Sequence, residues 1–132
     1  MRTNIRRTTT ALTVTGVALG ALLLGDGTAF AKSTIGLTVS SHSLRVGQSV
    51  RVTGSGGDDS VLYTYTCVDS RVGSGSWHAV SCSSKPYRSV TVSVRATRRG
   101  TLSFRTRLLG ARSTTGPRRL DRVSAPTTVV VH

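Results

Sequence analysis

The chain has 132 residues, of which 18 are lysine or arginine and 5 are acidic, so its formal net charge is +13. Such an excess of positive charge favours anionic partners: nucleic acid, anionic wall polymers, lipid head groups or acidic polysaccharide. An equally good explanation is that the charge only keeps a small protein soluble and apart from its copies. Once the leader described next is removed, the length excludes two domains with separate cores.

Residues 1–31 have the three parts of a secretory signal peptide. A head with three arginines precedes an apolar stretch at residues 11–24, and Ala29-Phe30-Ala31 supplies the small residues needed before a cut at Lys32. The apolar stretch is shorter than the ~20 residues that a transmembrane anchor needs. We therefore predict a cleaved signal peptide, a single domain at residues 32–132, and a secreted, extracellular product with no transmembrane anchor. This domain keeps 15 of the basic residues and four of the acids, a formal charge of +11.

Apolar and polar residues alternate along the predicted domain, which is typical of half-buried strands. Leu44, Val50 and Val52 occupy even positions, whereas polar residues occupy the odd positions between them. Segments rich in glycine, proline and serine separate the alternating runs and indicate turns. This spacing predicts an all-β, antiparallel β-sandwich. Its seven strands are expected near residues 34–40, 48–54, 60–69, 76–82, 87–97, 101–110 and 123–131.

Cys67 and Cys82 are the only cysteines and lie 15 positions apart. In an exported chain such a pair favours a disulfide over a metal site or a reactive thiol. If the two cysteines face each other across a hairpin, Val72 lies opposite Trp77. This register places Trp77 on the face of Val68, opposite the face of Cys67. Either face could meet the core, because the start of the strand is apolar on both sides.

Three segments resemble bacterial immunoglobulin-like domains of actinobacterial-type secreted proteins. They are a Val-Gly-Gln turn followed by an alternating strand at residues 45–54, a Gly-Ser-Trp-His-Ala-Val hairpin at residues 75–80, and a Gly-Thr-Leu-Ser-Phe strand at residues 99–105. The resemblance covers nearly all of the predicted domain in order. It implies a single immunoglobulin-like sandwich, and it bears on fold more than on function.

Few residues suggest catalysis or metal binding. Asp69, His78 and Ser81 could approach one another across the hairpin, but the expected register points Ser81 away from the other two. A Gly-x-Ser-x-Gly elbow is also missing from the sequence. Asp58-Asp59 cannot supply the six or more oxygens of a calcium site. We therefore predict a protein that is not an enzyme, with no catalytic residues, no metal and no cofactor.

Arginines are a stronger signal, because residues 70–120 contain many of them and no acid. Two should project from one outer face of a strand, and three belong to an expected loop at residues 110–122. Long loops without secondary structure are often functional, although a mobile solvated loop is an equally good interpretation. Aromatic residues are not interleaved with the arginines, so a specific nucleic-acid partner is not expected. The candidate binding residues are Arg105, Arg107, Arg112, Arg118 and Arg119.

These observations favour a small extracellular binding module. Its expected partner is an anionic surface or cell-envelope polymer, or an extracellular protein, bound through the arginine-rich face. One alternative is a secreted inhibitor of an extracellular hydrolase that presents residues 83–87, tethered by Cys82. Another is a small-molecule carrier similar to the antibiotic-binding sandwiches of actinomycetes. The sequence shows no wall-sorting motif or apolar C-terminal tail, so we expect the product to be released or held by charge alone.

Overall fold

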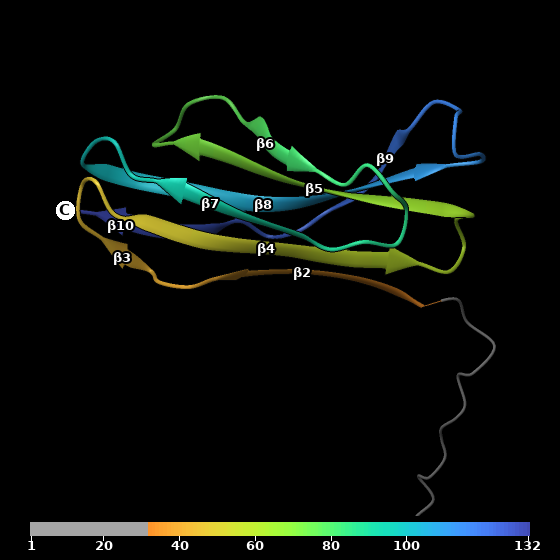
Figure 1. Cartoon of the computed structure of the whole chain (residues 1–132), viewed down its shortest axis with the longest axis horizontal. Helices are drawn as coiled ribbons and strands as arrows, with labels where there is room; N and C mark the ends of the chain where they lie inside the picture. The colour runs from red at the N-terminus through yellow and green to blue at the C-terminus, as the bar shows by residue number, and fades with distance from the viewer. Residues whose placement is uncertain (1–31) are drawn as a thin grey trace, which may run out of the picture. The chain divides into compact units, whose positions relative to one another are not determined.

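The computed structural model describes residues 32–132, and the regular structure in that part of the chain is all strand (Figure 1). No helix there could cross a membrane. The predicted signal peptide, at residues 1–31, lies outside the described residues. The strands are β2 (Ser33–Val39), β3 (Ser43–Leu44), β4 (Ser49–Asp58), β5 (Tyr63–Val72), β6 (His78–Cys82), β7 (Val90–Arg95), β8 (Gly100–Ala111), β9 (Arg119–Val123) and β10 (Thr127–Val131).

The strands form two sheets that face each other as layers (Figure 1). One sheet has the order β2-β4-β7, and the other has the order β3-β10-β8-β5-β6, with β9 also paired to β8. Every pair is antiparallel except β3 with β10, which is parallel. The all-β prediction is therefore confirmed. Its fully antiparallel form is wrong at this one short strand, which the alternation pattern did not predict.

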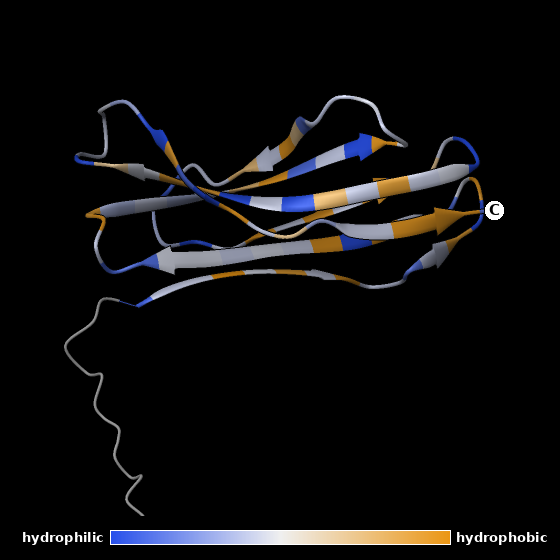
Figure 2. Ribbon diagram, turned by 180° about the vertical axis from the view of Figure 1, so that it is seen from behind, coloured by the Kyte–Doolittle hydropathy of each residue, from blue (hydrophilic) through white to orange (hydrophobic). Residues whose placement is uncertain are grey.

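The core lies between the sheets and follows the alternation in the sequence. Val50 and Val52 of β4 are fully buried against Val68, Phe104 and Val129 of the larger sheet. Apolar and polar bands alternate along the strands in Figure 2. Such alternation lets each sheet bury one face while the other face stays polar. The apolar positions therefore determine which faces of the two sheets pack against each other.

The last predicted strand, at residues 123–131, is wrong in one respect. It begins only at Thr127, as β10, because residues 124–126 are not in a strand and Val123 ends a separate strand, β9. β9 and β10 pair with successive halves of β8. Pro126 lies in the gap, where it cannot donate a ladder hydrogen bond. The expected loop at residues 110–122 is also wrong, because β8 continues to Ala111 and β9 begins at Arg119. The connection between them is limited to residues 112–118.

Cys67 and Cys82 form the predicted disulfide and lie directly opposite each other, with their Cα atoms 4.0 Å apart. Beyond Val68 the register of β5 and β6 shifts by one residue, so that Asp69 lies opposite Ala79. A bulge of this kind moves all later side chains to the other face of the sheet. The predicted placement of Trp77 beside Val68 is therefore wrong.

Candidate functional site

The possible Ser-His-Asp set is not assembled. In the observed register His78 lies opposite Ser70, one position along from Asp69. Neighbouring residues of a strand point to opposite faces, so His78 and Asp69 are on different sides of the sheet. The Asp69 carboxylate is occupied by two arginines instead. His78 and Asp69 therefore make no contact that could activate Ser81.

Asp69 is the centre of the outer face of β5 and β8. Its side chain is 2% exposed, and its Oδ2 accepts hydrogen bonds from Arg105 Nε at 2.9 Å and Arg107 Nε at 2.6 Å. The strand register places Arg105 directly opposite Asp69 and Arg107 opposite Cys67. The prediction that the two arginines share one face is confirmed. Much of their charge, however, is balanced within the protein.

Trp77 lies between two arginines on this same outer face. The guanidinium carbon of Arg71 is 4.6 Å from the ring centroid, and that of Arg105 is 4.5 Å away. Cation–π contacts of this type are favourable even when partly exposed. The long side chains cover β5, most of which is buried on both of its faces. The face of Val68 meets the core, and the face of Cys67 lies beneath this cover.

Arg118 is held over the same sheet by a different aromatic residue. Its guanidinium carbon is 3.5 Å from the centroid of the buried Tyr65 ring. One of its Nη1 hydrogens is donated to the backbone oxygen of Ser83 at 3.3 Å. These contacts fix the guanidinium and leave its other hydrogen-bond donors available.

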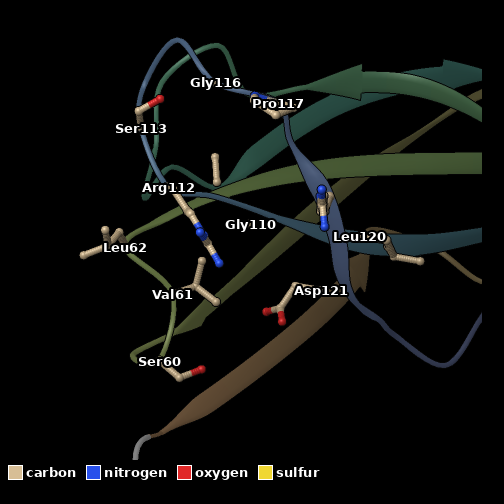
Figure 3. A pocket seen from close by; sticks show the side chains of 12 residues that line it. Ser60, Val61, Leu62, Gly110, Arg112, Ser113, Gly116, Pro117, Leu120 and Asp121 are labelled. Atoms are coloured by element: carbon tan, nitrogen blue, oxygen red, sulfur yellow. The ribbon is translucent and has the colours of Figure 1, made fainter.

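Arg112 and Arg119 lie elsewhere, at a cavity of about 730 Å³ (Figure 3). The cavity is bounded by the turn between β4 and β5, by the end of β8, and by the hairpin that joins β8 to β9. The structure therefore divides the five predicted arginines into two groups. Arg105, Arg107 and Arg118 lie on the outer face of β5 and β8, and the other two line the cavity.

Two carboxyl groups meet at one side of the cavity. The Asp121 carboxyl is hydrogen-bonded to the Asp58 carboxyl, and loss of solvent together with this neighbour raises the pKa of Asp121 above its ordinary value. Hydrogen bonds donated by the Ser60 hydroxyl and backbone N–H lower the pKa of Asp58. We therefore expect any proton shared by the pair to reside on Asp121.

The β8–β9 hairpin is the most strongly basic element that protrudes from the sheets. Four arginines, which we call the hairpin arginines, lie on it and are exposed to solvent: Arg112, Arg118, Arg119 and Arg122. Among residues 32–132, only Arg105 and Arg107 have an acidic partner within 4.0 Å. Arg122 attracts the carboxyl groups of Asp58 and Asp121 from a longer distance, which favours their charged forms. The hairpin therefore presents four guanidinium groups, none of which forms an ion pair within residues 32–132.

Sequence reasoning missed Asp69, Tyr65 and Trp77 as parts of this site. The pairing of β5 with β8 is long-range, so the position of Asp69 opposite Arg105 was not visible in local periodicity. Arg122 ended the expected binding loop at residues 110–122 but was not among the candidate binding residues. The series of arginines at residues 112–122 could have identified it as a candidate binding residue.

No known family model and no curated protein matches this chain. The described residues contain no group of three or more histidine, cysteine, aspartate or glutamate side chains that could hold a metal ion. Function is therefore inferred from the geometry of the arginines, the cavity and the loops that adjoin them.

Proposed function

We propose that the protein is a secreted, non-enzymatic, immunoglobulin-like module that binds an anionic polymer of the cell envelope through the hairpin arginines. The observation that carries this proposal is the contrast between two sets of arginines. Arg105 and Arg107 are bound by Asp69, whereas the hairpin arginines are exposed and none of them has a carboxylate within 4.0 Å among the described residues. Several exposed guanidinium groups on one hairpin suit the phosphate, sulfate or carboxylate groups along a chain.

The sheet order supports the immunoglobulin-like part of the proposal. The order β10-β8-β5 in one sheet and β2-β4-β7 in the other resembles the two sheets of immunoglobulin domains, in which early and late strands are interleaved. The disulfide supports export, because such bonds persist mainly in oxidising compartments. Both points fit the signal peptide predicted from the sequence.

The conformation of Arg118 supports binding at the hairpin. Its guanidinium is held by Tyr65 and by the backbone of Ser83, so little side-chain freedom would be lost when a ligand binds. The neighbouring guanidinium groups extend the positive charge along β9. A polymer could contact several of them at once, and each contact would release counterions.

Salt-dependent retention on immobilised heparin, a sulfated polysaccharide, tests the proposal. R112Q/R119Q removes two exposed hairpin arginines whose guanidinium groups have no carboxylate within 4.0 Å among residues 32–132. R98Q/R99Q is the matched control, because it removes the same charge from an exposed turn between β7 and β8. We expect R112Q/R119Q to elute at clearly lower sodium chloride and to reduce the slope of log affinity against log salt by about two.

The control variant distinguishes polymer binding at the hairpin arginines from binding through the net charge of the whole protein. We expect R98Q/R99Q to elute close to the unmodified protein. If both variants shift equally, the arginines act only through net charge. Retention that does not depend on salt would contradict polymer binding altogether.

A second candidate function, inhibition of an extracellular hydrolase, is favoured by the loop at residues 83–87. The backbone N–H of Ser83 and that of Tyr87 each bond to β5 at 2.8 Å, next to the disulfide of Cys82. Tyr87 has a φ of 62° and its side chain is 63% exposed. A non-glycine residue held in this left-handed region indicates a loop that is fixed from both ends.

A panel of secreted proteases and glycosidases tests inhibition. If the loop is inhibitory, micromolar protein should slow at least one of these enzymes, and K85A/Y87A should restore its activity. R98Q/R99Q should inhibit as well as the unmodified protein. A panel in which no enzyme is slowed rejects this second function and leaves the polymer proposal in place.

A further inference from the structure

The cavity between the β4–β5 turn and the β8–β9 hairpin has the dimensions of a small-molecule site (Figure 3). Its volume of about 730 Å³ lies within the range of roughly 300–1,000 Å³ that ligand pockets span. A polymer bound along exposed guanidinium groups would not need a hollow of this size. The cavity therefore calls for an explanation separate from polymer binding.

The walls of the cavity include large apolar side chains that are exposed to solvent. Val61, Leu62 and Leu120 all line it. Leu62 is 67% exposed and Leu120 is 60% exposed, although both are large aliphatic side chains. In Figure 3 Leu62 and Leu120 lie on opposite sides of the hollow. Apolar side chains at the rim of a hollow are typical of ligand-binding surfaces. An apolar ligand in the cavity would remove their surface from water.

Two features of the backbone shape the walls of the cavity. A Cβ atom added to Gly110 would lie 2.8 Å from Cγ1 of Val61, so the missing side chain lets Val61 pack against the end of β8. On the other wall, the register of β8 and β9 shifts at Asp121, which lies between residues paired with Leu108 and Leu109. Bulges of this kind redirect side chains and are frequent beside functional sites.

The polar residues that line the cavity favour a ligand with an acidic group. Arg112 and Arg119 line the cavity, and within residues 32–132 neither has a carboxylate within 4.0 Å. In Figure 3 the Arg112 side chain runs from the hairpin toward Val61. The acid in the lining, Asp121, is instead hydrogen-bonded to Asp58. Two guanidinium groups are thus free to meet an anion beside an apolar wall.

We propose that this cavity binds a small amphipathic acid, with its apolar body against Val61, Leu62 and Leu120 and its carboxylate on Arg112 and Arg119. The apolar wall supplies contact area, and the two guanidinium groups select for the acid over a neutral analogue. This site does not depend on polymer binding. It adds a small-molecule ligand to the same end of the molecule.

A titration with 1-naphthoate followed by amide NMR shifts tests the proposal. The neutral analogue 1-naphthalenemethanol has the same apolar body and serves as the comparison. We expect 1-naphthoate to bind at least about tenfold more tightly than the alcohol, a difference of about 1.4 kcal/mol. The shifted amides should belong to residues 60–62 and 110–121. Shifts spread over both sheets, or no binding of 1-naphthoate at millimolar concentration, would overturn the proposal.

Variants separate the apolar and charged parts of the site. L62S/L120S should weaken both probes about tenfold or more, whereas R112Q/R119Q should weaken only 1-naphthoate. V72S/V130S is the matched control, because it removes two aliphatic side chains that are also exposed, by 44% and 42%, and lie outside the cavity lining. Equal affinities of L62S/L120S and V72S/V130S would contradict the assignment.

The heparin experiment distinguishes the two proposals. L62S/L120S keeps every arginine, so it should elute from heparin with the unmodified protein while losing affinity for 1-naphthoate. If 1-naphthoate fails to bind while the heparin result stands, only the cavity assignment is lost. If heparin retention proves nonspecific while 1-naphthoate binds as expected, only the polymer proposal is lost.

Discussion

At the scale of single residues, Asp69 holds the arginines of the outer face in place. Its buried Oδ2 accepts hydrogen bonds from both Arg105 and Arg107, whose own side chains are about a quarter exposed. Because the carboxylate cannot reach bulk water, it depends on these charged donors. The position directly opposite Arg105 also aligns β5 with β8.

We predict that D69N destabilises the protein by about 2 kcal/mol, because asparagine keeps the shape but loses the charge that binds both guanidinium groups. Urea unfolding followed by Trp77 fluorescence measures the change. D59N is the control, since Asp59 is exposed and has no basic partner within 4.0 Å among residues 32–132. Equal midpoints for D69N and D59N would show that the ion pairs contribute nothing.

The paired carboxyls of Asp58 and Asp121 predict a pH dependence. The raised pKa of Asp121 means that the folded state favours its protonated form, so this contribution to stability is lost as pH rises through that pKa. The lowered pKa of Asp58 acts in the opposite direction, and its contribution is lost as pH falls through that lower pKa. When pH exceeds both pKa values, the two carboxyl groups are therefore like charges that face each other.

We predict that D121N raises the thermal midpoint at pH 7 and has little effect at pH 3. Asparagine supplies an N–H donor to Asp58 at every pH, as the protonated Asp121 does only in acid. Thermal unfolding at the two pH values measures the difference. A gain of the same size at both would show that the effect is not one of titration.

At the scale of strands, Gly54 sets the distance between the two sheets. A Cβ atom at this position of β4 would lie 2.8 Å from Thr106 Oγ1 and 2.9 Å from Val68 Cγ2. The Thr106 hydroxyl donates a hydrogen bond to the Gly36 backbone oxygen at 2.8 Å, which links β8 to β2 across the core. A side chain at Gly54 would push against this link.

We predict that G54A destabilises the protein by about 1–3 kcal/mol through overpacking. G57A in the same strand is the matched control, because a Cβ atom there meets nothing within 4 Å. Both changes reduce the freedom of the unfolded chain in the same way, so their difference reports the contact between sheets. Denaturant unfolding measures it, and equal midpoints would contradict close packing at Gly54.

Alternation along the sequence predicted most strands because each has one buried face, as Val50 and Val52 show. It could not predict the register shift after Val68, because a single extra residue in β6 leaves the local pattern almost unchanged. That shift alone placed Trp77 on the face of the arginines and not on the predicted face of Val68. The division of the predicted site has a similar cause, since Asp69, which binds Arg105, lies 36 residues away along the chain.

At the scale of the whole molecule, the formal charge of +13 is largely unbalanced. Among residues 32–132, the salt bridges involve a single acid, Asp69, and two arginines. Repulsion among the remaining positive charges opposes the compact state. The same repulsion would be relieved when an anionic polymer binds, so stability and binding should depend on salt in opposite directions.

We predict that thermal stability rises as sodium chloride increases from low concentration to 0.3 M, while heparin retention weakens. The screening length falls from about 30 Å at 0.01 M salt to about 8 Å at 0.15 M, which weakens repulsion between exposed arginines. Relief of about 1 kcal/mol would raise the midpoint by roughly 4–8 °C in a domain of this size. R98Q/R99Q should show a smaller rise, because less repulsion is left to screen. A midpoint that falls with salt would instead mean that attractive ion pairs outweigh the repulsion.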